Sequence, residues 1–284
     1  MRKFSYSQND LKKLLPKRDE SSNKGSCGRV LVIGGSPCMA GAPYFSAKAA
    51  YRTGCGLVEI FTHEDNRIIL QTLIPEAVLS TFGESIDLEK LGTSIKKADV
   101  IAIGMGLSTS EEALEILRFT LQNNNCPIVV DADALNLLAK NKDLFTLAKS
   151  NVIITPHPLE MSRISGVCIE KITVDIPSFA QDFADKSNVI CVLKDHNTAV
   201  AQPNSNNIYI NKSGNSGMST GGSGDVLDGI IAGLLAQGCD PYVAATLGVY
   251  IHGLAGDKAS EKLSQYSVMA SDIIDALPEV FSNL

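Results

Sequence analysis

The stretch "NSGMSTGGSGDVLDGIIAG", residues Asn215 to Gly233, holds six glycines and only two charged residues in nineteen positions. Apolar residues recur after it at spacings of one and four, which predicts a helix from Ser223 with one buried stripe: Val226, Leu227, Ile230, Ile231, Leu234 and Leu235. Asp225 lies off this stripe in the first turn. Backbone N–H groups there lack partners, and the helix dipole favours negative charge.

The number of glycines before this helix decides between two interpretations of Asp225. As a simple N-terminal carboxylate, Asp225 would stabilise its own helix by about 0.3–1 kcal/mol. One cap needs one flexible residue, however, whereas this loop has five: Gly214, Gly217, Gly221, Gly222 and Gly224. Several glycines allow the backbone to approach and hold an anion. A carboxylate beside a bound phosphate could then take a proton from an attacking hydroxyl. The loop matches neither the P-loop nor the dinucleotide pattern.

The rest of the chain alternates apolar runs with helix-like segments, which predicts an α/β fold with a parallel sheet covered on both faces. Strands are expected within residues 28–35, 57–62, 98–106, 126–134, 151–158 and 189–195, and a hairpin within 197–214. Helices are expected at 40–54, 111–124, 224–238, 242–263 and 268–281. We expect one domain over residues 1–284, in which residues 1–24 form an arm or a cap.

Composition excludes several classes of protein. The 284 residues are 44% hydrophobic and 20% charged, with a net charge of −6 and no basic block, so a nucleic-acid partner is not expected. The apolar runs are too short for a membrane span, and the first residues lack a secretory signal, which makes the cytoplasm the expected location. Seven cysteines without a CxxC pair indicate reduced thiols and no metal site.

Further stretches make the resemblance to one family specific. The GxGD turn before a late helix resembles the ribokinase-like fold, a three-layer α/β/α arrangement with a mostly parallel central sheet. Between Gly25 and Gly256 the chain then resembles the NAD(P)H-hydrate dehydratase family in its stand-alone form, since the length leaves no room for a fused epimerase. The matching stretches, in order, are "GRVLVIGGSPCMAGAPYFSAKAAYRTGCGLV", "PEAV", "ADVIAIGMGLS", "PIVVDADALN", "VIITPHPLEM", "VLKDHNTAV" and "NSGMSTGGSGDVLDGIIAG".

The resemblance implies a nucleotide-dependent dehydration. ADP or ATP, with Mg²⁺, would activate the hydroxyl of hydrated NADH or NADPH, and phosphate would then leave in place of the poorer leaving group hydroxide. Asp225 would act as the base, and the backbone N–H groups of Gly222, Ser223 and Gly224 would hold the phosphoryl group. No residue is assigned as an Mg²⁺ ligand. The resemblance also implies a homotetramer. The small faces of the alanine-rich helices suit close packing between subunits, but they suit packing of helix against sheet equally well.

Site residues follow from the same motifs. The substrate would contact Ala40, Gly106, His157 and Asp225. The nucleotide would contact Lys194, Asp195, His196, Asn197, Thr198, Asn215 and Gly224.

Several of these positions have structural alternatives. Lys194 could extend to solvent from a strand end, and His157 could be structural. Gly106, by contrast, lies with Gly104 at a strand end and fits a close approach of the ligand. The stretch "DADALN" supplies Asp131, Asp133 and Asn136, either as helix caps or as polar support near the phosphates.

Two residues depart from the family pattern, in which glycine is common. A carboxylate at Asp195 would repel phosphates unless it turned outward, and Leu159 changes the loop after His157.

Two other functions use the same features. A small-molecule kinase of this fold, acting on a vitamin-precursor alcohol, would also use Asp225. The turns around Ala40, Gly106 and His157 favour a larger dinucleotide substrate over the compact one that such a kinase needs. A nucleotide-binding regulatory module would bind without turnover.

Overall fold

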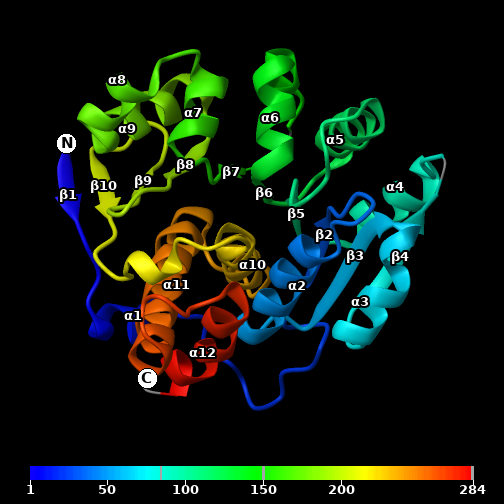
Figure 1. Cartoon of the computed structure of the whole chain (residues 1–284), viewed down its shortest axis with the longest axis horizontal. Helices are drawn as coiled ribbons and strands as arrows, with labels where there is room; N and C mark the ends of the chain where they lie inside the picture. Colours follow the sequence, from blue (N-terminus) through cyan, green and yellow to red (C-terminus); the bar gives the residue numbers. More distant parts are fainter. Residues whose placement is uncertain (84, 149–150, 283–284) are drawn as a thin grey trace.

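The computed structural model describes residues 1–83, 85–148 and 151–282, and it is built on one ten-stranded sheet (Figure 1). The strand order is β1-β10-β9-β8-β7-β6-β5-β2-β3-β4. The strands are β1 (Arg2–Phe4), β2 (Arg29–Ile33), β3 (Leu57–His63), β4 (Val78–Phe82), β5 (Val100–Ile103), β6 (Ile128–Val130), β7 (Val152–Ile154), β8 (Ile190–Leu193), β9 (Ala199–Ala201) and β10 (Asn207–Ile210).

Neighbouring strands run parallel from β8 across to β4, as the continuous apolar runs predict. The hairpin predicted within residues 197–214 is confirmed, because β9 pairs antiparallel with both β10 and β8. All the strands predicted from sequence are present. The sequence interpretation missed β4, which is partly exposed at the edge of the sheet, and β1, which pairs with β10 at the other edge.

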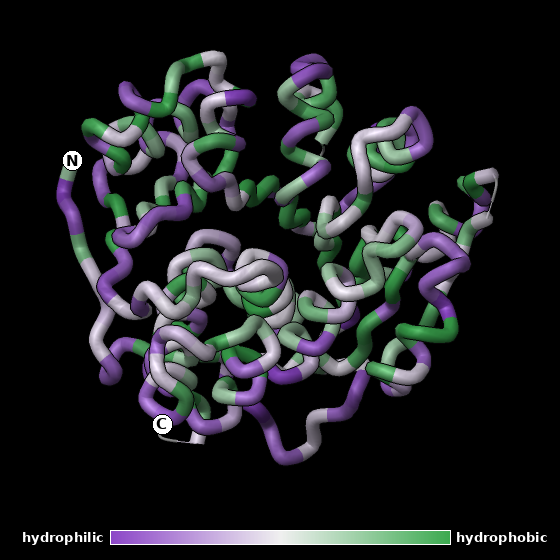
Figure 2. Tube along the Cα trace, viewed as in Figure 1, coloured by the Kyte–Doolittle hydropathy of each residue, from purple (hydrophilic) through white to green (hydrophobic). Residues whose placement is uncertain are grey.

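Helices cover both faces of the sheet, which confirms the three layers. The helices are α1 (Gln8–Leu14), α2 (Gly41–Thr53), α3 (Arg67–Leu73), α4 (Leu88–Lys97), α5 (Glu111–Asn123), α6 (Ala132–Lys140), α7 (Pro158–Ser165), α8 (Ile169–Val174), α9 (Ile176–Ser187), α10 (Ser223–Ala236), α11 (Pro241–Leu263) and α12 (Ala270–Ser282). One apolar core contains α1–α3 and α10–α12, and the other contains α4–α9 (Figure 1). Apolar segments follow the strands and α10 inside the molecule, whereas hydrophilic segments lie toward its outside (Figure 2).

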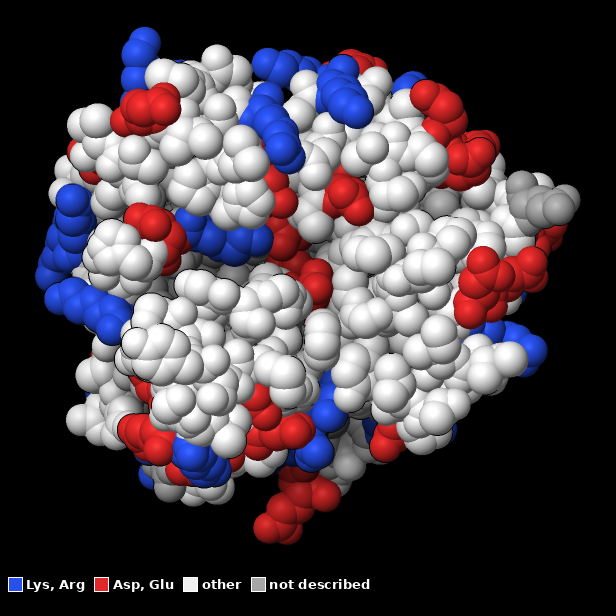
Figure 3. Space-filling view, viewed as in Figure 1, with Lys and Arg blue, Asp and Glu red and all other residues white. Residues whose placement is uncertain are grey.

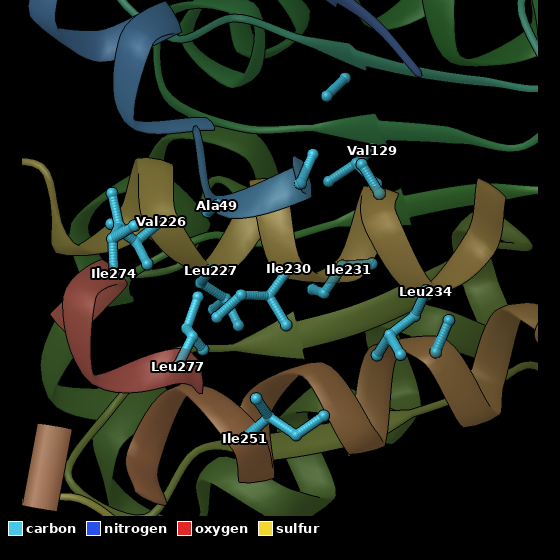
Figure 4. Close-up of a cluster of buried hydrophobic side chains, with 14 of the residues drawn as sticks. Ala49, Val129, Val226, Leu227, Ile230, Ile231, Leu234, Ile251, Ile274 and Leu277 are labelled. Carbon is cyan, nitrogen blue, oxygen red and sulfur yellow. The ribbon is translucent and has the colours of Figure 1, made fainter. Parts of the chain in front are cut away.

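Helix α10 corrects one expectation. Its apolar residues were expected to form one buried stripe, but every residue except Gly224 and Asp225 is buried. The reason is its central place: α2, α11 and α12 surround it, and the sheet closes the remaining side (Figure 4). Burial of this kind fixes the direction of the helix, and so fixes where its first turn points.

Residues 1–24 contain one strand and one helix. Leu11 of α1 is 1% exposed and belongs to the core that contains α11. Next to it, Phe4, Tyr6 and Tyr209 pack ring against ring. This segment therefore extends the same sheet and core.

Candidate active site

A cleft of about 890 Å³ lies at the carboxyl ends of the strands, where parallel α/β sheets bind ligands. The expected nucleotide contacts all line it: Lys194, Asp195, His196, Asn197, Thr198, Asn215 and Gly224. Ser223 and His157 line it as well. Ala40, Gly106, Gly222 and Asp225 are not among its lining residues. Acidic side chains gather in the central hollow of this face, beside basic ones (Figure 3).

The opening of α10 faces this cleft through Ser223 and Gly224. No side chain caps the helix. Ser223 N donates to the Thr220 carbonyl at 3.3 Å, so the N–H groups of Gly224 and Asp225 are the ones in its first turn that stay available. Gly222 has φ +89°, and a Cβ there would lie 2.7 Å from the Phe45 ring. A Cβ at Gly224 would meet Lys194 Nζ at 3.4 Å, whereas one at Gly221 would meet nothing within 4 Å. Conformation and packing therefore explain Gly222, and the glycine at 224 keeps the charged floor of the cleft accessible.

Asp225 is half-buried in the first turn of α10, and Ser46 Oγ donates to its backbone carbonyl at 2.8 Å. Its carboxylate has no hydrogen-bond partner in the described part of the chain. Burial, together with the charge of Asp131, raises the pKa of Asp225 to about 7, against the opposing effect of Lys194. A carboxylate with a pKa near the working pH is suited to general base catalysis.

Lys194 is held by Asp131 and does not extend to solvent. Its Nζ donates to both oxygens of Asp131, at 3.0 and 2.8 Å, and only 20% of its side chain is exposed. Burial opposes the charge of Lys194, but Asp131, Asp228 and Glu160 outweigh it and raise the lysine pKa. Asp131 occupies the N-cap of α6 without capping the helix, because its carboxylate binds the lysine. Two other polar residues of α6 bond to neighbouring elements and not to the lysine. Asp133 accepts a hydrogen bond from Ser108 N, and Asn136 Oδ1 accepts one from Arg163.

Asp228, one helical turn after Asp225, is a buried acid that the sequence interpretation missed. It is 0% exposed; its Oδ1 accepts from Thr155 Oγ1 at 2.9 Å, and its Oδ2 has no partner. Burial and the charge of Asp131 raise the pKa of Asp228 well above its usual range, which favours the neutral form of this carboxyl group. Its place in the helix pattern, between Leu227 and Ile230, indicates burial, but the sequence does not show which residues it would meet.

His157 is the N-cap of α7. Its Nδ1 accepts from the backbone N–H groups of Leu159 and Glu160, at 3.2 and 3.3 Å, and Glu160 Oε2 accepts from His157 N at 2.9 Å. This arrangement places the imidazole proton on Nε2, 3.3 Å from Glu160 Oε1. His157 thus has a structural role as a helix cap, and it also lies at the edge of the cleft. Leu159 is 43% exposed and fits the loop without strain.

In the loop after β8, the acid Asp195 pairs with its neighbour His196. Asp195 Oδ2 lies 3.0 Å from His196 Nδ1, and Thr198 Oγ1 donates to the Asp195 carbonyl at 3.0 Å. Across the cleft, all the polar capacity of the Asn215 side chain is used inside the protein, in bonds with Gly217, Gly256, Asp257 and Ser260. The backbone of Asn215, together with Ser219 and Thr220 of the same segment, remains to meet a ligand.

Ala40 and Gly106 lie on two turns that touch. Ser36 N donates to the Gly106 carbonyl at 2.6 Å, and a Cβ on Gly106 (φ +60°) would lie 3.0 Å from Met39 Cβ. These turns follow β2 and β5, between which the strand order reverses direction. Gly104 needs no ligand to explain it, since a Cβ there would lie 1.9 Å from the Asp131 carbonyl oxygen.

No group of three or more His, Cys, Asp or Glu side chains within the described ranges could hold a metal ion. None of the described helices is both long enough and apolar enough to cross a membrane. The described cysteines form no disulfide.

Comparisons with known proteins converge on one family. The sequence model of the NAD(P)H-hydrate dehydratase family matches residues 30–279. The chain is 41% identical over 279 residues to the bifunctional NAD(P)H-hydrate repair enzyme of Moorella thermoacetica, covering 95% of this chain but about half (52%) of that protein. It is 36% identical to the ADP-dependent (S)-NAD(P)H-hydrate dehydratase of Streptococcus thermophilus, covering 96% of this chain and 97% of that protein.

Solved structures agree. The ADP/ATP-dependent NAD(P)H-hydrate dehydratase of Bacillus subtilis, co-crystallized with ATP/Mg²⁺, superposes with a TM-score of 0.83 at 29% identity, covering 98% of this chain and 97% of that one. A ribokinase-like superfamily protein is also among the similar structures, so the fold predicted from sequence is confirmed.

Proposed function

Because the chain belongs to the NAD(P)H-hydrate dehydratase family, we propose that it repairs hydrated NADH and NADPH by nucleotide-dependent dehydration. The opening of α10 carries the proposal: uncapped backbone N–H groups face a large cleft, and a carboxylate with a raised pKa stands beside them. Such an opening can hold a phosphoryl group and deprotonate an alcohol next to it.

The proposed reaction has two steps. Asp225 takes the proton of the hydrate's hydroxyl, whose oxygen forms a bond to the terminal phosphorus of ADP or ATP, and the bond to the nucleotide breaks. The N–H groups of Gly222, Ser223 and Gly224 stabilise the charge on the phosphoryl oxygens during transfer. The C–O bond then breaks and phosphate leaves with the electron pair. Loss of a proton from the adjacent carbon restores the dihydronicotinamide.

The nucleotide would lie between the loop after β8 and the segment from Asn215 to Thr220, which face each other across the cleft. Lys194 contributes its charge from below, oriented by Asp131. The substrate would approach from the touching turns of Ala40 and Gly106, with His157 at the rim. Mg²⁺ prefers hard oxygen ligands and keeps several waters. Since no protein cage forms among the described residues, the nucleotide phosphates would supply its main ligands.

The test is direct. NADH is hydrated with acid and given purified protein, Mg²⁺ and either ADP or ATP, and the dihydronicotinamide absorbance is followed. We expect recovery that requires a nucleotide, with one phosphate released per NADH restored. No recovery with either nucleotide would refute the proposal. Phosphorylation of a small alcohol under the same conditions would favour the vitamin-precursor kinase instead, and binding without turnover would favour the regulatory module.

We also propose the cytoplasm as the location and a homotetramer as the assembly. The alanine-rich faces of α2 and α11 do not support the tetramer, because Ala47, Ala50, Ala244 and Ala245 are buried within the chain itself. A better surface is the edge near β4, where Ile68, Ile69, Leu73 and Val78 are 47–70% exposed. Light scattering on the purified protein measures the mass that decides this point.

A further inference from the structure

His252, in the middle of α11, lies across from the opening of α10 and lines the same cleft. Its Nε2 is 3.2 Å from the hydroxyl oxygen of Ser223, the first residue of α10. Ser223 is 8% exposed and stands between the two glycines proposed to hold the phosphoryl group. The other imidazole nitrogen, Nδ1, has no protein partner among the described residues, and His252 is only partly buried where it lines the cleft.

The direction of this hydrogen bond decides what Ser223 can offer a ligand. If the Ser223 hydroxyl donates its hydrogen bond to His252 Nε2, only oxygen lone pairs remain for a ligand, and these repel a phosphoryl oxygen. If Nε2 carries the proton and donates to Ser223, the hydroxyl proton is free to point at the anion. An anion at the opening of α10 therefore requires the second direction.

We propose that His252 is a positioning residue: with its proton on Nε2, it donates to Ser223 Oγ and turns the Ser223 hydroxyl proton toward the transferring phosphoryl group. This inference rests on the proposed function. The imidazole is neutral in this role, because burial and the nearby charge of Lys194 lower the pKa of His252 to about 4. The ring can then donate at Nε2 while Nδ1 accepts a hydrogen bond from water or from an N–H or O–H group of the bound nucleotide.

Kinetics test the coupling between the two residues. Loss of one donor to a developing phosphoryl charge costs about a hundredfold in kcat, so we expect that loss in S223A. In H252F the hydroxyl stays but is undirected, and we expect kcat to fall about tenfold with the ADP dissociation constant nearly unchanged. In S223A/H252F the rate should stay within about twofold of S223A, because the histidine then has nothing to direct. H252Q, whose amide can donate, should restore most of the rate lost in H252F.

His63 offers a matched control, because it lies at the end of β3 beside Asp65 and outside the cleft. H63F should leave kcat unchanged. Circular dichroism and thermal unfolding show whether each variant is folded. If H252F slows the reaction as much in the S223A background as in the wild type, the histidine does not act through Ser223 and the inference is overturned.

Nitrogen NMR of the wild type gives a readout that does not depend on turnover. Labelled imidazoles report which ring nitrogen carries the proton, and H252Q identifies the His252 signals by their loss. We expect a neutral ring protonated at Nε2, with and without ADP. A proton on Nδ1 overturns the inference whatever the activity. Absence of hydrate repair in the wild type refutes the proposed function instead.

Discussion

Helices α2 and α10 begin side by side at the same edge of the sheet, yet their openings differ in charge. Both follow glycine-rich turns, neither has a side-chain cap, and the two helices pack along their length. Helix α2 has no acidic residue in its first turn, and its opening residue Ala40 is buried. Helix α10 carries Asp225 in its first turn and Asp228 one turn later, facing Lys194 and Asp131.

This difference separates binding from chemistry. An uncapped opening without charged side chains can attract an anion but cannot move a proton. An opening with a partly buried carboxylate can do both, at the cost of keeping unpaired acid groups away from water. Within the proposed function, α10 would transfer the phosphoryl group and α2 would only bind the dinucleotide.

The largest expected effect is that of Asp225→Asn. The amide keeps the shape of the site but cannot accept the hydroxyl proton, so kcat should fall by about 10²–10⁴-fold. ADP affinity, measured by calorimetry, should stay within the wild-type range. The opening of α2 has no carboxylate equivalent to Asp225, so no single substitution there should reduce kcat to this extent. A near-normal rate in Asp225→Asn would remove the distinction between the two openings.

The second effect is pH dependence. Since the pKa of Asp225 is raised to about 7 and the base must be ionised, kcat/KM should fall about tenfold for each pH unit below 7 and level off above it. Burial and the charge of Asp131 also raise the pKa of Glu160 to about 7. The variant Glu160→Gln distinguishes the two acids, because its pH profile should match that of the wild type if Asp225 is the base.

The same shift links pH to stability. The raised pKa favours the neutral form of Asp225 in the folded protein, so its contribution to stability is present at low pH and is lost as the pH rises through 7. The melting temperature should therefore fall less between pH 5 and pH 8 in Asp225→Asn than in the wild type. An equal loss in both proteins would contradict the assigned shift.

A pair of glycines compares the two openings in stability. Gly222→Ala forces a Cβ into the left-handed region and against Phe45, so unfolding free energy should fall by about 1–3 kcal/mol. Gly41→Ala, at the start of α2, brings its Cβ no closer than 4.0 Å to Phe45 and should be neutral or slightly stabilising. Denaturant titration measures both. If Gly41→Ala raises KM for the hydrate while the fold is intact, the binding role of α2 is strengthened.

Much of this arrangement could be predicted from the sequence. Glycine spacing, apolar runs and Asp225 identify the fold and the anion-holding turn, because backbone demands of this kind are local. The ion pair of Lys194 with Asp131 could not be derived, since 63 positions separate the two residues and only the sheet order brings their strand ends together. The same reason hides the contacts of Asp228 with Thr155 and of His252 with Ser223.

The smallest expected effect concerns Asp228 and sharpens the contrast within α10 itself. In the proposed reaction Asp225 must ionise, whereas burial and the charge of Asp131 favour the neutral form of Asp228. Thr155 donates to Oδ1 of Asp228, and its Oδ2 has no partner among the described residues. Asp228→Asn keeps the oxygen that accepts from Thr155. Its amide group places N–H protons where the neutral carboxyl group would carry its O–H proton, at Oδ2. Unfolding free energy should therefore change by less than about 1 kcal/mol, and kcat by less than about threefold.

Asp228→Leu is the matched variant, because it removes the acceptor and leaves the Thr155 hydroxyl unpaired, which should cost about 1–3 kcal/mol. Two aspartates three residues apart on one helix would thus respond in opposite ways to the same change: the amide abolishes turnover at 225 and is tolerated at 228. If Asp228→Asn destabilises the protein as much as Asp228→Leu does, then Asp228 is ionised in the folded state. The buried charge balance around Lys194 would then have to include a second permanent anion.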